Sequence, residues 1–258
     1  MYCIRYFILS FKINKMKKYG LIGFPLSHSF SKEYFNVKFL DENINDCHYK
    51  NYELKNLNEF NLILKEKDLL GLNVTIPYKE EIISYLDEID ETAKKIGSVN
   101  VIKISRGRLI GFNSDYLAFN QTIKEWLPSL KISALILGSG GSSKAVKYAL
   151  DNLNISYTLV SRNASAKKIS YDDLNRGNFL SENKLIINTT PLGMFPKLNS
   201  CPDIDFGQLN EENYVYDLIY NPEVTDLLSR ARKRGAKIKN GLEMLHLQAK
   251  ISWDLWNN

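Results

Sequence analysis

Apolar residues along this chain follow two alternating spacings, which predict strands and helices in alternation. Short apolar runs at 19–23 ("YGLIG") and 71–77 ("GLNVTIP") are typical of buried strands. The segments 32–40 and 57–66 instead repeat apolar residues every three or four positions, as an amphipathic helix does. Strands separated by helices imply right-handed crossovers and a mostly parallel sheet.

The same pattern predicts a second unit in the latter half of the chain. We expect the first unit to continue with helices over 79–97 and a hairpin over 99–112. The expected elements of the second unit are a helix at 116–127, strands at 134–138, 157–161, 184–190 and 214–220, and a helix at 224–235. A last helix, 242–256, is expected to cross back over the first unit and hold the two together.

A chain of 258 residues is long enough for two domains with separate cores. We therefore predict an α/β protein with a substrate domain of residues 16–115 plus 241–258, whose sheet is mostly parallel, and a Rossmann-like domain of residues 116–240. Residues 1–15 are expected to be an upstream extension, because "MKKYGLIG" from Met16 resembles a natural beginning. The apolar run within that extension is too short to span a membrane.

Composition and charge exclude several classes of protein. Hydrophobic residues make up 44% of the chain and charged residues 24%, as in ordinary globular proteins. The 34 basic and 29 acidic residues are scattered, so the net charge of +5 forms no basic stripe of the kind that binds nucleic acid. We expect no nucleic acid and no membrane as partners, and a monomer or homodimer that binds a small molecule.

The residues that most often bind metals are few and far apart. The chain has three cysteines and three histidines, Cys3, Cys47, Cys201, His28, His48 and His246. The spacing of the cysteines fits neither a disulfide framework nor a metal motif, and the histidines share no metal-ligand spacing. This pattern predicts a cytoplasmic protein without a metal.

Glycines stand between an expected buried strand and an expected amphipathic helix in "LILGSGGSSKAVKYAL". Gly138, Gly140 and Gly141 would let the backbone approach a pyrophosphate, which the free N–H groups at the start of the helix would bind. The phosphate loop of NTPases is excluded, because Ser143 stands where that motif has its second glycine. A tight turn without a ligand remains as the alternative.

The strand after this turn distinguishes the two nicotinamide cofactors. NAD enzymes carry an Asp or Glu near its end, whereas NADP enzymes carry a cation. No acid occurs between Tyr157 and Ser170, and Arg162 occupies the site with Lys167 and Lys168 close behind. A guanidinium binds a 2′-phosphate through two oxygens, so NADP is favoured. An exposed arginine in a loop is the alternative.

Polar side chains follow several expected strands and could line one cleft. Pro77 ends a strand, so Lys79 lies at the exit of that strand. Ser31 in the "SHSFS" loop and Asp115 in a turn occupy similar places. Either could simply cap a helix, and an isolated lysine is usually solvated. Their combination opposite a nicotinamide-binding domain favours a polyhydroxylated, anionic substrate.

Gln248 is predicted to point inward from the last helix. It shares a helix face with Met244, Ile251 and Leu255. A buried amide needs a hydrogen-bond partner. A substrate hydroxyl and a backbone carbonyl of the first domain would both serve.

Taken in order from Tyr19 to the last helix, these motifs resemble the shikimate dehydrogenase family. They include "SHSFS", "NVTIPYK", "GSVNV", "FNSD", "GSGGSS", "SRN", "NTTPLGM", "YDLIY" and "NGLEMLHLQA". The resemblance implies a catalytic pair, Lys79 and Asp115. It implies a substrate site of Ser29, Ser31, Asn73, Thr75, Lys79, Asn100, Asp115, Tyr220 and Gln248. It implies an NADP site of Gly138, Ser139, Gly140, Gly141, Ser142, Ser161, Arg162, Asn163, Thr189, Leu218 and Gly241.

The chain departs from the family pattern at two of these places. Tyr116 follows the expected catalytic aspartate where the family commonly has glycine, which leaves the backbone at the domain junction open. Ala166 stands where the family has a second phosphate-binding arginine, so the strength of the preference for NADP over NAD is also open. Lys167 or Lys168 could replace that arginine.

The resemblance implies reversible, NADPH-dependent reduction of 3-dehydroshikimate to shikimate, in chorismate and aromatic amino-acid biosynthesis. Hydride arrival at a carbonyl carbon builds negative charge on its oxygen, which Lys79 would meet with a proton or a close positive charge. Asp115 would hold Lys79 and a substrate hydroxyl. The alternatives are a quinate/shikimate dehydrogenase of broader specificity that uses NAD, and a non-catalytic relative that binds a ligand as a sensor.

Overall fold

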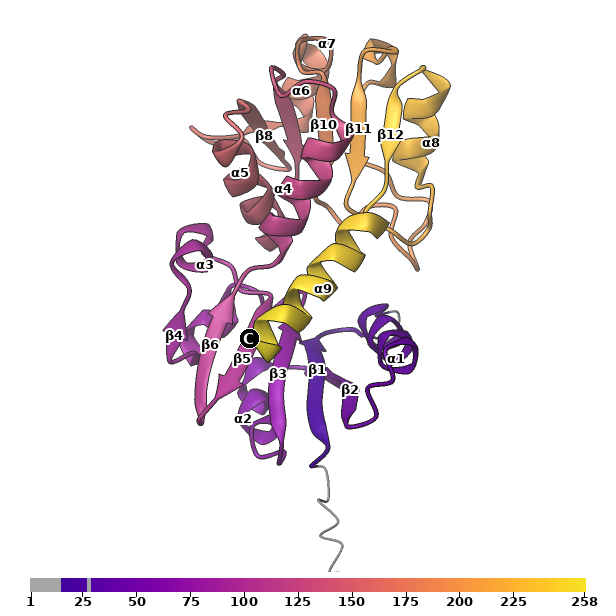
Figure 1. The fold of residues 1–258 in the computed structure, drawn as a ribbon. Helices are drawn as coiled ribbons and strands as arrows, with labels where there is room; N and C mark the ends of the chain where they lie inside the picture. The colour runs from indigo at the N-terminus through magenta and orange to yellow at the C-terminus, as the bar shows by residue number, and fades with distance from the viewer. Residues whose placement is uncertain (1–14, 27–28) are drawn as a thin grey trace, which may run out of the picture.

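The computed structural model describes residues 15–26 and 29–258. The expected extension, apart from Lys15, and the predictions for Cys3 and His28 lie outside these residues. Figure 1 shows two sheets at opposite ends of the molecule, each with helices packed against it. The prediction of an α/β fold with two sheets is confirmed.

The first sheet has the strand order β2-β1-β3-β5-β6-β4. Its strands are β1 (Lys17–Gly23), β2 (Cys47–Glu53), β3 (Leu69–Val74), β4 (Glu88–Ile89), β5 (Val101–Ser105) and β6 (Arg108–Phe112). Its helices are α1 (Ser31–Asp41), α2 (Phe60–Ile63) and α3 (Glu91–Ile96), with 3₁₀ turns at Leu57–Glu59 and Glu81–Tyr85. Strands β1, β2 and β3 are parallel, as is β4 with β6, but β5 runs antiparallel to both of its neighbours. The sheet is therefore mixed, with parallel pairs in the majority.

The expectation of helices throughout 79–97 is wrong in part, because the short strand β4 interrupts the segment. Asp87 pairs with β6 through both its backbone and its side chain, which accepts from the Leu109 N–H at 2.7 Å. Asp90 then caps α3 by accepting from the backbone N–H groups of Thr92 and Ala93. These bonds to a distant strand hold β4 at the sheet edge, and a two-residue strand leaves no periodicity in the sequence.

The second sheet is parallel throughout and has the order β12-β11-β10-β7-β8-β9. Its strands are β7 (Ala134–Leu137), β8 (Tyr157–Ser161), β9 (Ile169–Ser170), β10 (Leu185–Asn188), β11 (Tyr214–Asp217) and β12 (Lys237–Lys239). Its helices are α4 (Asp115–Trp126), α5 (Gly141–Asn152), α6 (Tyr171–Arg176), α7 (Phe179–Glu182) and α8 (Asp226–Lys233), with a 3₁₀ turn at Phe206–Gln208. The order reverses between β7 and β10, and such a switch point leaves a ligand crevice at the carboxyl ends of the strands.

The last helix, α9 (Leu242–Asn257), runs from the second sheet back across the first, as predicted (Figure 1). Near its start, Met244 packs in the core of the second unit with Phe119 of α4. At its end, the Trp256 ring stacks on Tyr19 at 4.9 Å, and Trp256 Nε1 donates to the Ile102 carbonyl at 3.0 Å. One helix thus belongs to both cores and sets how the two halves face each other.

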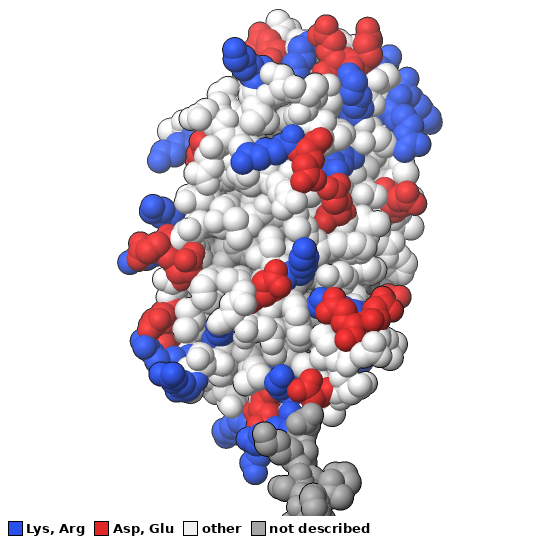
Figure 2. Space-filling view, viewed as in Figure 1, with Lys and Arg blue, Asp and Glu red and all other residues white. Residues whose placement is uncertain are grey.

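Acidic and basic side chains are interspersed over the face shown in Figure 2, as the scattered charges of the sequence led us to expect. Among the helices of the described residues, none is long and apolar enough to cross a membrane. The described cysteines, Cys47 and Cys201, are unpaired, and burial raises their pKa to about 11 and about 12. Both therefore stay as thiols near neutral pH.

Candidate active site

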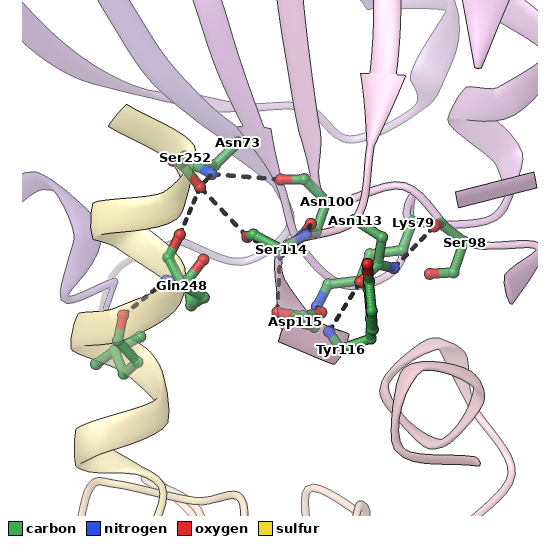
Figure 3. A network of polar contacts seen from close by, with 11 residues as sticks. Asn73, Lys79, Ser98, Asn100, Asn113, Ser114, Asp115, Tyr116, Gln248 and Ser252 are labelled. Atoms are coloured by element: carbon green, nitrogen blue, oxygen red, sulfur yellow. Dashed lines mark hydrogen bonds and ion pairs between the residues drawn. The ribbon is translucent and has the colours of Figure 1, made fainter. Parts of the chain in front are cut away.

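Lys79 and Asp115 form an ion pair where the first half of the molecule meets the second. Lys79 lies in the turn after β3, and its Nζ atom is 2.6 Å from Oδ2 of Asp115, the first residue of α4. The second carboxylate oxygen accepts from Asn100 Nδ2 at 2.8 Å (Figure 3). Both side chains are largely buried, with 14% and 10% of their surface exposed. The ammonium is thereby held at one position while keeping two N–H bonds for other acceptors.

The helix-cap alternatives for Ser31 and Asp115 are not what the structure shows. Each residue is the first of its helix, and the N-cap residues before them, Phe30 and Ser114, make no side-chain cap bond among the described residues. At the start of α4 it is Asn113 Oδ1 that accepts a backbone N–H, from Tyr116 at 3.2 Å. The side chain of Ser31 instead interacts with Tyr49 of β2. Both polar groups are therefore directed away from their own helices.

A second polar network joins β3 to the last helix. The Asn73 amide oxygen accepts from Tyr49 Oη at 2.8 Å, and its Nδ2 donates to Ser252 Oγ at 2.9 Å and to the Asn100 carbonyl at 3.3 Å. Ser252 Oγ in turn donates to the Gln248 carbonyl at 2.7 Å (Figure 3). Because these groups are buried and mutually bonded, they fix α9 against the edge where β3 ends.

These residues surround a cavity of about 520 Å³, a size suited to a small molecule. Every residue predicted for the substrate lines it, namely Ser29, Ser31, Asn73, Thr75, Lys79, Asn100, Asp115, Tyr220 and Gln248. Apolar side chains complete the wall, including Pro191 and Met194 from the second unit and Met244 from α9. The arrangement places an ammonium, a carboxylate, amides and hydroxyls around one apolar-walled space.

Tyr220 and Gln248 approach the cavity from the second sheet and from α9. Burial raises the pKa of Tyr220, although an interaction with the Phe30 backbone opposes the rise. The phenol therefore stays protonated and can donate. Gln248 Nε2 donates to the Leu245 carbonyl in the preceding turn at 3.0 Å, so a backbone carbonyl of its own helix is the partner seen here.

The glycine-rich turn joins β7 to α5 at the switch point of the second sheet. Gly138 has a φ of +107°, and a Cβ there would lie 2.8 Å from Thr189 Oγ1, so the position requires glycine. A Cβ on Gly140 would meet no atom within 4 Å, so this part of the turn faces open space. Ser142, in the first turn of α5, lines the cavity next to the Lys79 pair.

Of the other residues predicted for the cofactor, Ser139 lies in the glycine-rich turn and Thr189 just after β10, and neither lines the cavity. The rest form two groups. Leu218 and Gly241 line the cavity and touch each other, because a Cβ on Gly241 would lie 2.1 Å from the Leu218 carbonyl oxygen. Ser161, Arg162 and Asn163 lie at the end of β8 and do not line it. Ser161 Oγ donates to the Asn163 carbonyl at 2.6 Å, which shapes that turn, and the Arg162 side chain is exposed. The predicted cofactor residues thus extend from the cavity to the edge of β8.

Sequence reasoning missed some polar groups that complete the site. Ser252 and Ser114 lie 3.4 Å apart through their hydroxyls and join the two networks. Ser252 follows Gln248 by four residues, so helical spacing could have placed it on the same face. Tyr49 lies in β2, and no local pattern links it to Asn73. Within residues 15–26 and 29–258, no group of three or more His, Cys, Asp or Glu side chains could hold a metal ion.

Comparison with known proteins agrees with this geometry. Residues 21–102 match the family model described as "Shikimate dehydrogenase substrate binding domain". The chain is 38% identical to the shikimate dehydrogenase (NADP(+)) of Methanococcus vannielii, over 92% of this chain and 90% of that one. It is 37% identical to the protein of the same name from Methanocaldococcus jannaschii, over 94% and 92% of the two chains.

Comparison with solved structures also finds shikimate dehydrogenases. A shikimate dehydrogenase in complex with NADP+ superposes with a TM-score of 0.82, at 33% identity and with 93% and 90% of the chains covered. The Thermus thermophilus enzyme in complex with NADP(H) and shikimate also has a TM-score of 0.82, at 28% identity over 93% of each chain. A 5-ketofructose reductase of Gluconobacter has a TM-score of 0.77 at 25% identity, so the fold by itself does not define the substrate. With more than a third of its residues identical over nearly the full length of both chains, the protein belongs to the shikimate dehydrogenase family.

Proposed function

We propose that this protein is an NADP-dependent oxidoreductase that reversibly reduces 3-dehydroshikimate to shikimate, a step of chorismate and aromatic amino-acid biosynthesis. The observation that carries the proposal is the Lys79–Asp115 pair on the wall of a cavity that Ser142 of the glycine-rich turn also lines. Relatives that cover nine-tenths of the chain bear the name shikimate dehydrogenase (NADP(+)). The polar lining suits a polyhydroxylated carboxylate.

The residues present fit an NADP molecule. The turn at Gly140 faces open space at the amino end of α5, where free N–H groups and the helix dipole favour a pyrophosphate. At the end of β8, Arg162 is exposed and no acid occurs between Tyr157 and Ser170. A carboxylate there would repel a 2′-phosphate, whereas a guanidinium binds it. Ser139, Gly141, Ser161, Asn163 and Thr189 would complete this binding surface.

The cofactor, when bound, supplies the hydride or accepts it. The chain contributes charge and proton transfer at the substrate oxygen. Lys79 would meet the negative charge that develops on that oxygen, because its ammonium is held by Asp115 and keeps two further N–H bonds. Asp115 would also accept a bond from a substrate hydroxyl. Asn100 keeps the carboxylate in place by donating to it.

The other lining residues would orient the substrate. Ser29 and Ser31 lie at the start of α1 and would bind its carboxylate, while Tyr220 and Gln248 would bind hydroxyls. Asn73 and Thr75 come from the end of β3 and the turn after it.

We propose residues 16–115 plus 241–258 as the substrate domain and 116–240 as the cofactor domain. We also propose a cytoplasmic location, in keeping with the free thiols, and a monomer or homodimer.

The test follows NADP-linked oxidation of shikimate by the wild type and by Lys79→Ala, with NAD in parallel. We expect turnover with NADP and a kcat lower by about 10²- to 10⁴-fold in Lys79→Ala, the usual range for a general acid. Ser29→Ala should chiefly raise the KM for shikimate. The matched control is Lys124→Ala, an exposed lysine on α4, which should leave kcat unchanged.

Two results would contradict the proposal. Equal or better turnover with NAD and quinate would favour the broader quinate/shikimate dehydrogenase. A folded wild type that binds NADPH but turns over no shikimate would favour another ketone substrate, as in the 5-ketofructose reductase with the same fold, or a non-catalytic binding protein.

A further inference from the structure

The glycine-rich turn and the Lys79 segment lie next to each other. A Cβ placed on Gly141, the first residue of α5, would lie 3.4 Å from both Lys79 Cβ and Ser98 Oγ. Ser98 is fully buried, and its hydroxyl has no hydrogen-bond partner among the described residues. The amino end of α5 therefore faces the base of the Lys79 side chain, at a separation that would just admit a methyl group on Gly141.

Lys144, in the first turn of α5, bonds across this contact. Its Nζ atom lies 2.5 Å from Glu80 Oε2 and donates to the Gly97 carbonyl at 3.3 Å. Glu80 is the chain neighbour of Lys79, and Gly97 ends α3. A positive side chain in the first turn of a helix is disfavoured by the helix dipole. The Lys144 ammonium is instead stabilised by the Glu80 carboxylate and the Gly97 carbonyl, which lie outside α5. Both partners of Lys144 belong to the first half of the chain.

Tyr116 makes a second connection between the same elements. Its ring packs edge-on against Tyr148 of α5 with centroids 5.2 Å apart, and its hydroxyl interacts with Thr92 of α3. Its backbone N–H donates to Asn113 Oδ1 at 3.2 Å, next to the Lys79–Asp115 pair (Figure 3). We call the contacts of Lys144 and Tyr116 with α3, α5 and Glu80 the α5 seam.

Hydrogen bonds of the backbone connect the α5 seam to Lys79. The Val99 N–H donates to the Lys79 carbonyl at 2.8 Å, two residues after the carbonyl that Lys144 binds. Asn113 Nδ2 donates to the Ser98 carbonyl at 2.8 Å. We therefore expect that a shift of Gly97 also shifts Val99, which bonds to the Lys79 backbone just before β5. A shift of Asn113 should likewise move the start of α4.

We propose that Lys144 and Tyr116 are positioning residues that hold the amino end of α5 against the Lys79 segment. They set where the Lys79 ammonium stands relative to a cofactor bound at the turn. This inference rests on the proposed function, because the placement matters for hydride and proton delivery to one substrate. Neither residue lines the cavity, so neither touches the substrate there.

The test combines kinetics with hydrogen exchange in the cofactor-free protein. Lys144→Met and Glu80→Gln should each lower kcat roughly tenfold with the KM for NADP unchanged, since a 1 Å misplacement costs up to about 100-fold. The Val99 amide should exchange faster in both variants. The charge-swapped double variant Lys144→Glu with Glu80→Lys should recover part of kcat. Tyr116→Leu should also lower kcat and speed exchange at Val99. The matched control Lys147→Met, on the same helix as Lys144, should change neither kcat nor this exchange rate.

The possible outcomes separate the alternatives. Unchanged kcat and unchanged exchange at Val99 in Lys144→Met would reduce the pair to an ordinary surface ion pair and overturn the proposal. A raised KM for NADP in Lys144→Met, with a lowered one in Glu80→Gln, would mean that Lys144 binds a cofactor phosphate, which also overturns it. If the wild type turns over no shikimate, the proposed function fails, and exchange at Val99 alone still decides whether the seam holds the Lys79 segment.

Discussion

At the scale of single residues, we predict that the choice of cofactor depends most directly on Arg162. It is exposed at the end of β8, in the place where an acid would select NAD. Ala166 contributes no charge, and Ser165 and Lys168 bond to each other through their backbones in a tight turn. We therefore expect the guanidinium to make the main contact with a 2′-phosphate, with Lys167 and Lys168 as the nearest other cations in the sequence.

Arg162→Ala is expected to raise the KM for NADP roughly 10- to 100-fold, because a hydrogen bond to a charged group contributes about 1.5 to 3 kcal/mol. The KM for NAD should change little, since NAD lacks the 2′-phosphate. Initial rates at varied cofactor concentration measure both constants. Arg176→Ala, an exposed arginine on α6, serves as the control. An equal loss with both cofactors would show that Arg162 stabilises the turn and does not recognise the phosphate.

At the scale of elements, the Asp217 carboxylate connects two strands, a loop and a helix by hydrogen bonds. At the end of β11 its carboxylate accepts from Asn188 of β10, from the backbone N–H of Ile219, and from Thr225, which caps α8. The loop between β11 and α8 carries Leu218 and Tyr220 to the cavity. Asp217 is fully buried, and burial raises the pKa of its carboxyl to about 6 from 3.8, against the effect of these hydrogen bonds.

The folded protein holds the Asp217 proton more tightly than the unfolded chain does. Proton binding therefore stabilises the fold fully below about pH 4, and this stabilisation is lost as the pH rises through about 6. Asp217→Asn cannot ionise, so its free energy of unfolding should lack this decline. Between about pH 4 and pH 7, the difference between the two proteins should shift by up to about 3 kcal/mol in favour of the variant. Urea unfolding at several pH values measures it, and a difference independent of pH would mean that the hydrogen bonds cancel the effect of burial.

At the scale of the whole molecule, α9 joins the two halves through two different cores. A Cβ on Gly71 would lie 2.3 Å from the Trp256 ring, so the ring lies directly on the backbone of β3. The same helix supplies Gln248 and Met244 to the cavity. Packing at the far end of α9 therefore helps to hold the site in shape.

Trp256→Ala should lower the free energy of unfolding by about 3 to 5 kcal/mol, as expected for removing a buried aromatic side chain. The variant loses the stack on Tyr19 and the bond to the Ile102 carbonyl. Denaturant unfolding followed by circular dichroism measures the change. Leu40→Ala, at a position 78% exposed, should change stability by less than about 0.5 kcal/mol. A loss below about 1 kcal/mol in Trp256→Ala would mean that the end of α9 contributes little to the fold.

Much of the fold and of the candidate site could be predicted, because the relevant patterns are local. The glycines between β7 and α5, the proline after β3 and the apolar spacing of α5 each act within a few residues, where backbone geometry and helix periodicity decide the outcome. The nine residues predicted for the substrate all line one cavity, since all but Gln248, which lies within α9, are at or near the ends of elements or in the turns between them.

What the sequence by itself determined was therefore the alternation of elements, the glycine-rich turn with Arg162 just after the next strand, and the identity of the polar residues near element ends. The tertiary structure decided the short strand β4, the bonds of Asn73 to Tyr49 and Ser252, and the contact of Lys144 with Glu80. These depend on partners 22 to 179 residues apart in the chain. No local preference records such a partner, because each pairing exists only once distant segments of the chain have folded against each other.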